Sequence, residues 1–193
     1  MASDAVLPAP IFFEAAGAAI AEDAELLAAL HDRELTTDLI TALHEADFPD
    51  SLSLLPVRQE AVSAWRMMGK ALAALPYLTD TPQLDELAAE YAAIYLTGAY
   101  GASPCESVWT DDDHLVCQAA MFQLRALYAA RGLATPDWRQ RADDHLVLQL
   151  LFIAHLARTA RAPDDWRALA TLLDEHPLRW IEEFAGRVAA RTC

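Results

Sequence analysis

Two short runs combine carboxylates with a histidine, the residue types that bind metal ions or transfer protons. Asp111–His114 form one run and Asp143–His145 form the other. Neighbouring residues on a helix point about 100° apart, so neither run alone directs several ligands at one ion. The chain contains no His-Glu-x-x-His and no Glu-x-x-His pair. Acids that favour the positive end of a helix dipole explain both runs better, and we predict no metal and no cofactor.

Ser107 and Cys105 are the candidate nucleophiles, and neither has the sequence surroundings that activate one. Ser107 is not part of a Gly-x-Ser-x-Gly elbow. His114 and His145 are the conceivable bases for Cys105, but no spacing places either within hydrogen-bond reach. The glycines between positions 98 and 101 lack the lysine of a phosphate-binding loop. We therefore predict no catalytic residue and no enzyme, which leaves a binding or interaction protein.

The stretch EYAAIYLTGAYGASPCESVW, residues 90–109, is the most promising binding surface. It starts as the end of a helix and continues through a loop with three turn-forming residues, Gly98, Gly101 and Pro104. Loops that lie between helices and carry aromatic side chains are common binding surfaces. We therefore expect the functional loop to span residues 97–110.

Charge restricts the class of partner. The formal net charge is -15, and residues 1–50 hold eleven acids against the single base Arg33. Phosphate backbones are repelled by such a surface, so nucleic acid is not expected as a partner. A cationic peptide would be attracted, although acidic surfaces also serve solubility alone.

Length and composition predict one soluble domain, residues 1–193, in the cytoplasm. No apolar run approaches the roughly 18 residues of a membrane helix, so membrane insertion is not expected. The first ten residues carry no base before their apolar stretch, which argues against a secretory signal. Cys105, Cys117 and Cys193 are odd in number and lack a Cys-x-x-Cys spacing, which indicates free thiols.

Helical periodicity predicts an all-α bundle of about eight helices, with no competing strand pattern. Start signals for the successive helices are Pro10, Thr36 or Thr37, Pro56, Thr81, Thr110, Asp143, Pro163 and Pro177. The helix at about 143–160 is apolar on nearly all sides, so it should lie in the centre of the bundle.

Two of these helices carry specific core expectations. The helix from Pro56 should bury Val57, Ala61, Trp65, Met68, Leu72 and Leu75. The helix capped by Thr110 should have Asp111, Asp112 and Asp113 in its first turn and stop at Gly132. Its core face should be Leu115, Ala119, Phe122 and Ala126.

A family resemblance adds to this reading. The segments Glu90–Tyr95 and Ser103–Trp109, then Asp144-His145-Leu146 before an apolar helix, resemble the TorD/DmsD/NarJ family of all-α cytoplasmic chaperones. The tail His176–Trp180 with Phe184 is also similar. Ile94-Tyr95 replaces the family's common Leu-Phe pair, and Asp143 replaces a Pro. Members of this family mature complex iron–sulfur molybdoenzymes.

The resemblance implies a chaperone that binds the N-terminal segment of its client, often a twin-arginine signal peptide. Such a chaperone delays export or membrane attachment and assists loading of the molybdenum cofactor into the apo catalytic subunit. Recognition of apolar and arginine residues needs an apolar floor and an acidic rim. The matching residues are Tyr91, Ile94, Tyr95 and Trp109 for the floor, Asp144 and Glu106 for the rim, and Pro104 and Ser107 for the shape of the loop. His145 is included beside Asp144, although a helix cap explains that pair equally well.

Two alternatives stay open from the residues alone. One is a permanent structural subunit of a redox complex, and the other is a metal-dependent hydrolase built on His114 and His145. A monomer is expected, with a dimer formed by exchange of helices as the alternative.

Overall fold

The computed structural model describes residues 9–75 and 81–190. The first eight residues and Cys193, on which two of the expectations above depend, lie outside the described parts. Helices account for nearly all regular structure within those parts, in the order α1 to α9 with two shorter helical segments, η1 and η2. The all-α prediction is confirmed. Within the described residues, no helix is both long enough and apolar enough to cross a membrane.

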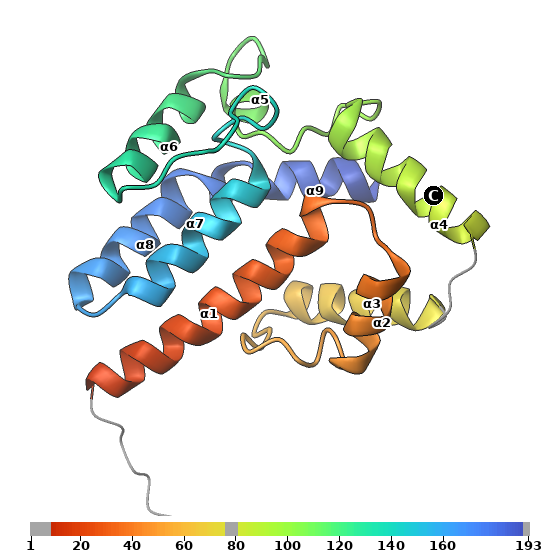
Figure 1. The fold of residues 1–193 in the computed structure, drawn as a ribbon, viewed down its shortest axis with the longest axis horizontal. Coiled ribbons are helices and arrows are strands. Elements are labelled where there is room, and N and C mark those ends of the chain that lie inside the picture. The colour runs from red at the N-terminus through yellow and green to blue at the C-terminus, as the bar shows by residue number, and fades with distance from the viewer. Residues whose placement is uncertain (1–8, 76–80, 191–193) are drawn as a thin grey trace, which may run out of the picture.

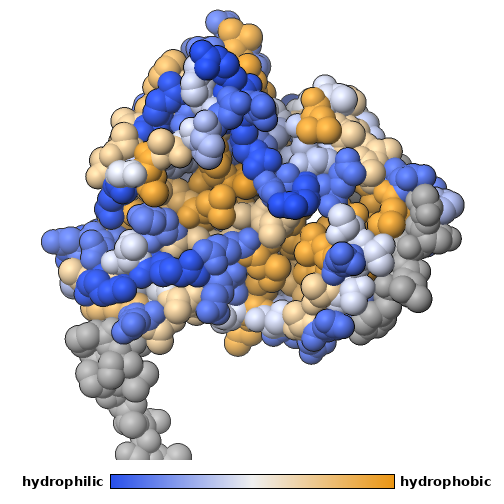
Figure 2. Space-filling view, viewed as in Figure 1, coloured by the Kyte–Doolittle hydropathy of each residue, from blue (hydrophilic) through white to orange (hydrophobic). Residues whose placement is uncertain are grey.

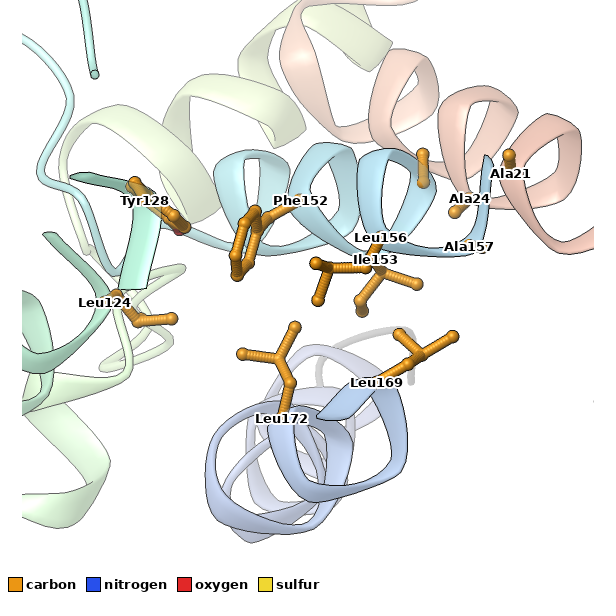
Figure 3. Close-up of a cluster of buried hydrophobic side chains, with 11 residues drawn as sticks. Ala21, Ala24, Leu124, Tyr128, Phe152, Ile153, Leu156, Ala157, Leu169 and Leu172 are labelled. Carbon is orange, nitrogen blue, oxygen red and sulfur yellow. The ribbon is translucent and has the colours of Figure 1, made fainter. Parts of the chain in front are cut away.

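The main core lies where α1 (Ala9–Asp32) runs along α7 (Leu146–Thr159). Figure 1 shows α6 (Ala119–Ala130), α7 and α8 (Pro163–Glu175) on one side of α1. Ala21, Ala24 and Ala28 on α1 are buried, and their small side chains let α1 lie close to α7. Side chains of α6, α7 and α8 complete this cluster, as Figure 3 shows for Leu124, Phe152 and Leu172. α7 is therefore the central helix that its apolar sequence predicts.

A second, smaller core lies on the other side of α1 (Figure 1). It joins the end of α1 to α2 (Thr37–Glu45), α3 (Gln59–Ala74) and α4 (Thr81–Tyr91) through the buried residues Ile40, Leu43 and Leu72. Thr36 caps α2 as predicted, because its side chain accepts a hydrogen bond from the Leu39 N–H at 3.2 Å. α8 begins at Pro163, as predicted, with the proline in the first turn.

The predicted third helix begins too early. α3 starts at Gln59, so Val57 lies outside it with 94% of its surface exposed, and Ala61 is exposed as well. The Asp23 carboxylate accepts hydrogen bonds from the Ser53 and Leu54 N–H groups and so ties the segment before α3 to α1. Leu72 is buried, and Trp65, Met68 and Leu75 are half-buried, as their spacing indicates.

The predicted fifth helix is wrong at its start and in its core face. Thr110 does not cap a helix but ends the short α5 (Ser107–Thr110), and α6 begins only at Ala119. Between them, the Asp111 carboxylate accepts hydrogen bonds from the N–H groups of Asp113 and Leu115 and forms a turn in place of a helix. The predicted face is exposed. The buried residues of α6 are Ala120, Met121, Leu124 and Tyr128.

Two helix ends also differ from expectation. α4 continues into a π-helix, η1 (Ala92–Leu96), in which the Thr97 N–H reaches back to the Ala92 carbonyl at 2.9 Å. The last predicted helix is divided at Trp180 into η2 (Pro177–Arg179) and α9 (Ile181–Ala189). α7 starts at Leu146 and not near Asp143, because the two aspartates before it bond to other segments.

Gly17 provides a test of the close contact between α1 and α7. A Cβ atom at Gly17 would lie 2.3 Å from the Ala157 carbonyl oxygen, a backbone atom that cannot move aside alone. We expect Gly17→Ala to lower the free energy of unfolding by about 1–3 kcal/mol, the usual range for overpacking. Chemical denaturation monitored by circular dichroism measures this change.

Gly186, inside α9, is the matched control because a Cβ there meets no atom of the described residues within 4 Å. Gly186→Ala should leave stability unchanged or raise it by up to about 1 kcal/mol, since alanine favours helix. Equal destabilisation by both substitutions would contradict the close α1–α7 contact.

Candidate functional site

The loop at residues 102–110 is attached to the start of α7 by backbone hydrogen bonds. The Leu146 N–H donates to the Pro104 carbonyl at 2.7 Å, and the Glu106 N–H donates to the Asp144 carbonyl at 3.1 Å. Cys105 and His145 thereby face each other as a single antiparallel bridge. The segment that follows α6 thus lies directly against the predicted functional loop.

The Asp144 side chain fixes the first turn of α5. It is completely buried, and Oδ2 accepts a hydrogen bond from the Ser107 N–H at 2.8 Å. Ser107 is also buried, and its hydroxyl oxygen accepts from the Gln118 N–H at 3.1 Å. Among the residues that the structure describes, none forms a hydrogen bond with Asp144 Oδ1. The Asp144 carboxylate is therefore placed to hold α5 and does not form part of an exposed rim in this structure.

Glu106 is the centre of a second set of buried hydrogen bonds. Gln149 Nε2 on α7 donates to Glu106 Oε2 at 3.0 Å and to the Asp144 carbonyl at 2.9 Å. His176 Nδ1, at the end of α8, lies 3.1 Å from Glu106 Oε1. All three side chains are buried, and Glu106 has no exposed surface. Glu106 therefore connects the loop to two helices that are distant in sequence and, like Asp144, is not exposed.

Sequence reasoning missed the partners of these two acids. Gln149 is the clearest missed signal, because it is a polar residue inside an otherwise apolar helix and a buried amide needs partners. His176 offers a weaker signal, since it is the residue before the Pro177 break. Asp143 is also buried and accepts hydrogen bonds from the Arg125 guanidinium at 2.7 Å and from the Thr135 hydroxyl at 2.7 Å.

The predicted floor residues form an aromatic cluster beside the loop. Tyr91 and Tyr95 are stacked with ring centroids 4.7 Å apart. Tyr95 and Trp109 each meet the buried Phe184 ring of α9 edge-on at 6.3 Å. The π-helix η1 carries Tyr95 to this position, and Ile94 packs against the same cluster.

Hydrogen bonds orient the polar atoms of these rings. The Tyr91 hydroxyl donates to the Asp32 carbonyl at 2.8 Å, and Trp109 Nε1 donates to the Ser103 carbonyl at 2.8 Å. The Tyr95 hydroxyl is hydrogen-bonded to His31 Nδ1. Burial raises the pKa of the Tyr91 hydroxyl, and the charges of Asp32 and Glu34 raise it further. The aromatic cluster is therefore a fixed surface with carboxylates beside it.

The nine predicted site residues lie in one region but differ in exposure. Tyr91, Ile94, Tyr95 and Trp109 are half-buried and present part of their surface to solvent. The remaining five are buried, namely Pro104, Glu106 and Ser107 within the loop and Asp144 and His145 before α7. Two exposed acids lie close to the aromatic cluster: Glu34, whose charge acts on Tyr91, and Glu90, which accepts a hydrogen bond from the Tyr100 hydroxyl at 3.4 Å. Neither Glu34 nor Glu90 was singled out by the sequence analysis.

Metal-binding and nucleophilic chemistry receive no support from the described geometry. Within the described residues, no three His, Cys, Asp or Glu side chains converge as ligands would. His114 lies on the turn before α6, where Nδ1 is 2.8 Å from the Val108 carbonyl oxygen. Burial, together with the Asp144 charge, raises the pKa of the Cys105 thiol to about 12, so the thiolate is scarce at neutral pH.

An apolar cavity of about 290 Å³ lies on another face of α7, away from the nine residues. Leu133 and Pro136 form one wall, and Leu148, Leu151 and His155 form the other. Figure 2 shows hydrophobic residues gathered in a hollow over α7. The hollow lies between α1 on one side and the part of the molecule that carries α6 on the other. This cavity offers an exposed apolar surface for comparison with the aromatic cluster.

His145 caps α7 and supplies a test through pH. Its Nδ1 accepts a hydrogen bond from the Val147 N–H at 3.2 Å. Burial, with the nearby charges of Arg141 and His31, lowers the His145 pKa from 6.5 to about 4. Between these two pH values the unfolded chain binds a proton that the folded chain does not bind. The contribution of His145 to stability is therefore complete above pH 6.5 and is lost as pH falls towards 4.

We expect the free energy of unfolding to fall by an amount on the order of 3 kcal/mol from this residue across that interval. His145→Asn keeps a capping side chain but does not titrate, so its stability should depend less on pH. Urea unfolding at a series of pH values compares the two proteins. Parallel stability curves for both proteins would contradict the buried, neutral state of His145.

Comparison with known proteins assigns the family. The family model described as nitrate reductase delta subunit matches residues 58–186. A protein named "Chaperone protein TorD" from Vibrio cholerae serotype O1 is 31% identical over 169 residues, which cover 83% of this chain and 76% of that protein. A protein of the same name from Shewanella sp. strain MR-4 is 24% identical over 171 residues, covering 82% of this chain and 80% of the relative. No solved structure matches significantly. The chain therefore belongs to the nitrate reductase delta subunit family, the non-catalytic molybdoenzyme maturation chaperones that include TorD.

Proposed function

We propose that this chaperone binds the N-terminal leader of the apo catalytic subunit of a molybdoenzyme in the cytoplasm. Binding delays export of the client and keeps it available while the molybdenum cofactor is inserted. The protein acts by holding its client and performs no chemical turnover. The two relatives named "Chaperone protein TorD" support the chaperone part of this proposal.

The observation that carries the proposal is the half-exposed aromatic cluster of Tyr91, Tyr95 and Trp109. Aromatic rings offer a large contact area with few torsions to restrict, and they are enriched where binding energy concentrates. Here the rings are held by stacking, by Phe184 and by hydrogen bonds to backbone carbonyls. A surface that is already ordered loses little further conformational entropy when a peptide binds.

Charge supports a leader that contains arginine. The exposed Glu34 and Glu90 lie beside the cluster, and the whole chain has a formal net charge of -15. We assign to these two acids the rim role first predicted for Glu106 and Asp144. The buried Glu106 and Asp144 then act indirectly, because they fix the turn that carries Trp109.

The runner-up function is a permanent structural subunit of a redox complex. The family description, nitrate reductase delta subunit, is the observation that favours it. A permanent subunit would co-purify with the mature, cofactor-loaded enzyme. A chaperone would be recovered only with the apo client.

Calorimetric titration with a synthetic twin-arginine leader from a candidate molybdoenzyme tests the proposed site. We expect Tyr91→Ala and Trp109→Ala to weaken binding by about tenfold or more, the loss typical of an aromatic anchor. The Glu34→Gln, Glu90→Gln double variant should also weaken binding, and added salt should weaken the parent complex. Circular dichroism confirms that each variant keeps its helical content.

Leu151→Ala is the matched control, because Leu151 is 44% exposed in the apolar cavity away from the cluster. It should bind the leader as tightly as the parent does. A loss of affinity in Leu151→Ala alone would place the leader in that cavity. Unchanged affinity in every variant would refute the assignment to the aromatic cluster, and a leader with both arginines changed to glutamine tests the charge contribution separately.

A further inference from the structure

Two free cysteines lie on neighbouring segments at the edge of the candidate site. Cys105 precedes α5, and Cys117 precedes α6, and both are half-buried thiols. After α5 the chain turns back on itself, and the Gln118 N–H donates to the Ser107 hydroxyl oxygen at 3.1 Å. This hydrogen bond joins the residue after Cys117 to the residue two positions after Cys105.

The electrostatics of Cys105 agree with this proximity. The charge of a Cys117 thiolate is among the causes that raise the Cys105 pKa, after burial and the Asp144 carboxylate. Charges influence one another noticeably in a protein only at short range, because water and salt screen distant pairs. The two thiols therefore lie within the range, roughly 10 Å, over which charges act on each other in a protein.

The backbone between the two cysteines is held in an unusual conformation. Cys117 has φ of 60° and His114 has φ of 54°, both in the left-handed region that non-glycine residues seldom occupy. Side-chain hydrogen bonds from Asp111 and Ser107 hold this segment in place. Residues 111–118 belong to neither α5 nor α6, so a change in their backbone need not move either helix.

We propose that Cys105 and Cys117 form a reversible intramolecular disulfide in the presence of a small-molecule disulfide oxidant. The closed loop would contain α5 and therefore Trp109. Oxidation would tie residues 111–118 to the loop at 102–110 and restrict the movement of that tryptophan. This would make the candidate client surface responsive to the redox state of its surroundings, independently of which partner it binds.

Oxidised glutathione serves as the oxidant, and the exchange is balanced. The Cys117 thiolate attacks one sulfur of oxidised glutathione, whose disulfide bond breaks and releases one reduced glutathione. Cys105 loses its proton to solvent and attacks the Cys117 sulfur, which releases the second reduced glutathione. Two protein thiols are oxidised by two electrons, and one glutathione disulfide is reduced. Since burial disfavours the Cys105 thiolate, the second step should be slow at neutral pH and should accelerate as pH rises.

The test is mass spectrometry of the folded, fully reduced protein after incubation with oxidised glutathione and alkylation of the remaining thiols. The sequence has no Lys or Arg between Lys70 and Arg125, so trypsin would leave both cysteines in one peptide. Chymotrypsin, which cleaves after Trp109, separates them. We expect the Cys105 and Cys117 peptides to appear as a linked pair that is released by reductant, with the protein lighter by two hydrogen atoms.

Variants identify the source of the link. Cys193→Ser should leave it intact, whereas Cys105→Ser and Cys117→Ser should each abolish it. Cys105→Ser should leave a glutathione adduct on Cys117. Ser107→Ala removes the hydrogen bond to Gln118 and should slow the linkage. Glutathione adducts on both cysteines without a linked pair would overturn the proposal, and so would links that form only between chains and increase with protein concentration.

Discussion

The hydrogen bond from the Ser107 N–H to the buried Asp144 carboxylate is the contact on which the candidate site depends. A buried carboxylate is costly unless hydrogen bonds compensate it, and the fold supplies them from several directions. The Asp144 carboxylate accepts a hydrogen bond from the first residue of α5. The Glu106 carboxylate accepts one from Gln149 on α7 and is within hydrogen-bonding distance of His176 at the end of α8. Loop 102–110 thereby becomes part of the packed interior, although it lies between helices in the sequence.

The aromatic surface follows from that attachment. Once α5 is held, Trp109 is brought against Phe184, and the π-helix η1 turns Tyr95 towards the same ring. π-helices are frequent at functional sites because the extra residue redirects side chains at some cost in stability. The exposed fractions separate two groups of residues. Glu106 and Asp144 are buried and hold the loop, whereas the three rings of the cluster and the acids Glu34 and Glu90 are partly or fully exposed to solvent.

Several elements could be predicted from the sequence because their causes are local. The apolar circumference of α7, the Thr36 cap of α2 and the proline at the start of α8 each act within a few residues. The turn at Asp111 could not be predicted from the sequence, because three consecutive acids suit a helix start and an Asx-type turn equally well. Burial of Glu106 and Asp144 also escaped prediction, since it depends on partners such as Gln149 and His176 that are distant in sequence. The family resemblance pointed to η1, loop 102–110 and the start of α7, but only the three-dimensional contacts separate the residues that support the loop from those that face solvent.

Hydrogen–deuterium exchange of the backbone amides of the free protein tests this account most directly. If the buried acids hold the loop, the Glu106 and Ser107 N–H groups should exchange about as slowly as those in the middle of α7. Exchange of both amides as fast as that of the exposed Val57 would contradict the account. In that case the loop would not be a fixed part of the fold, and the aromatic surface would form only when a partner binds.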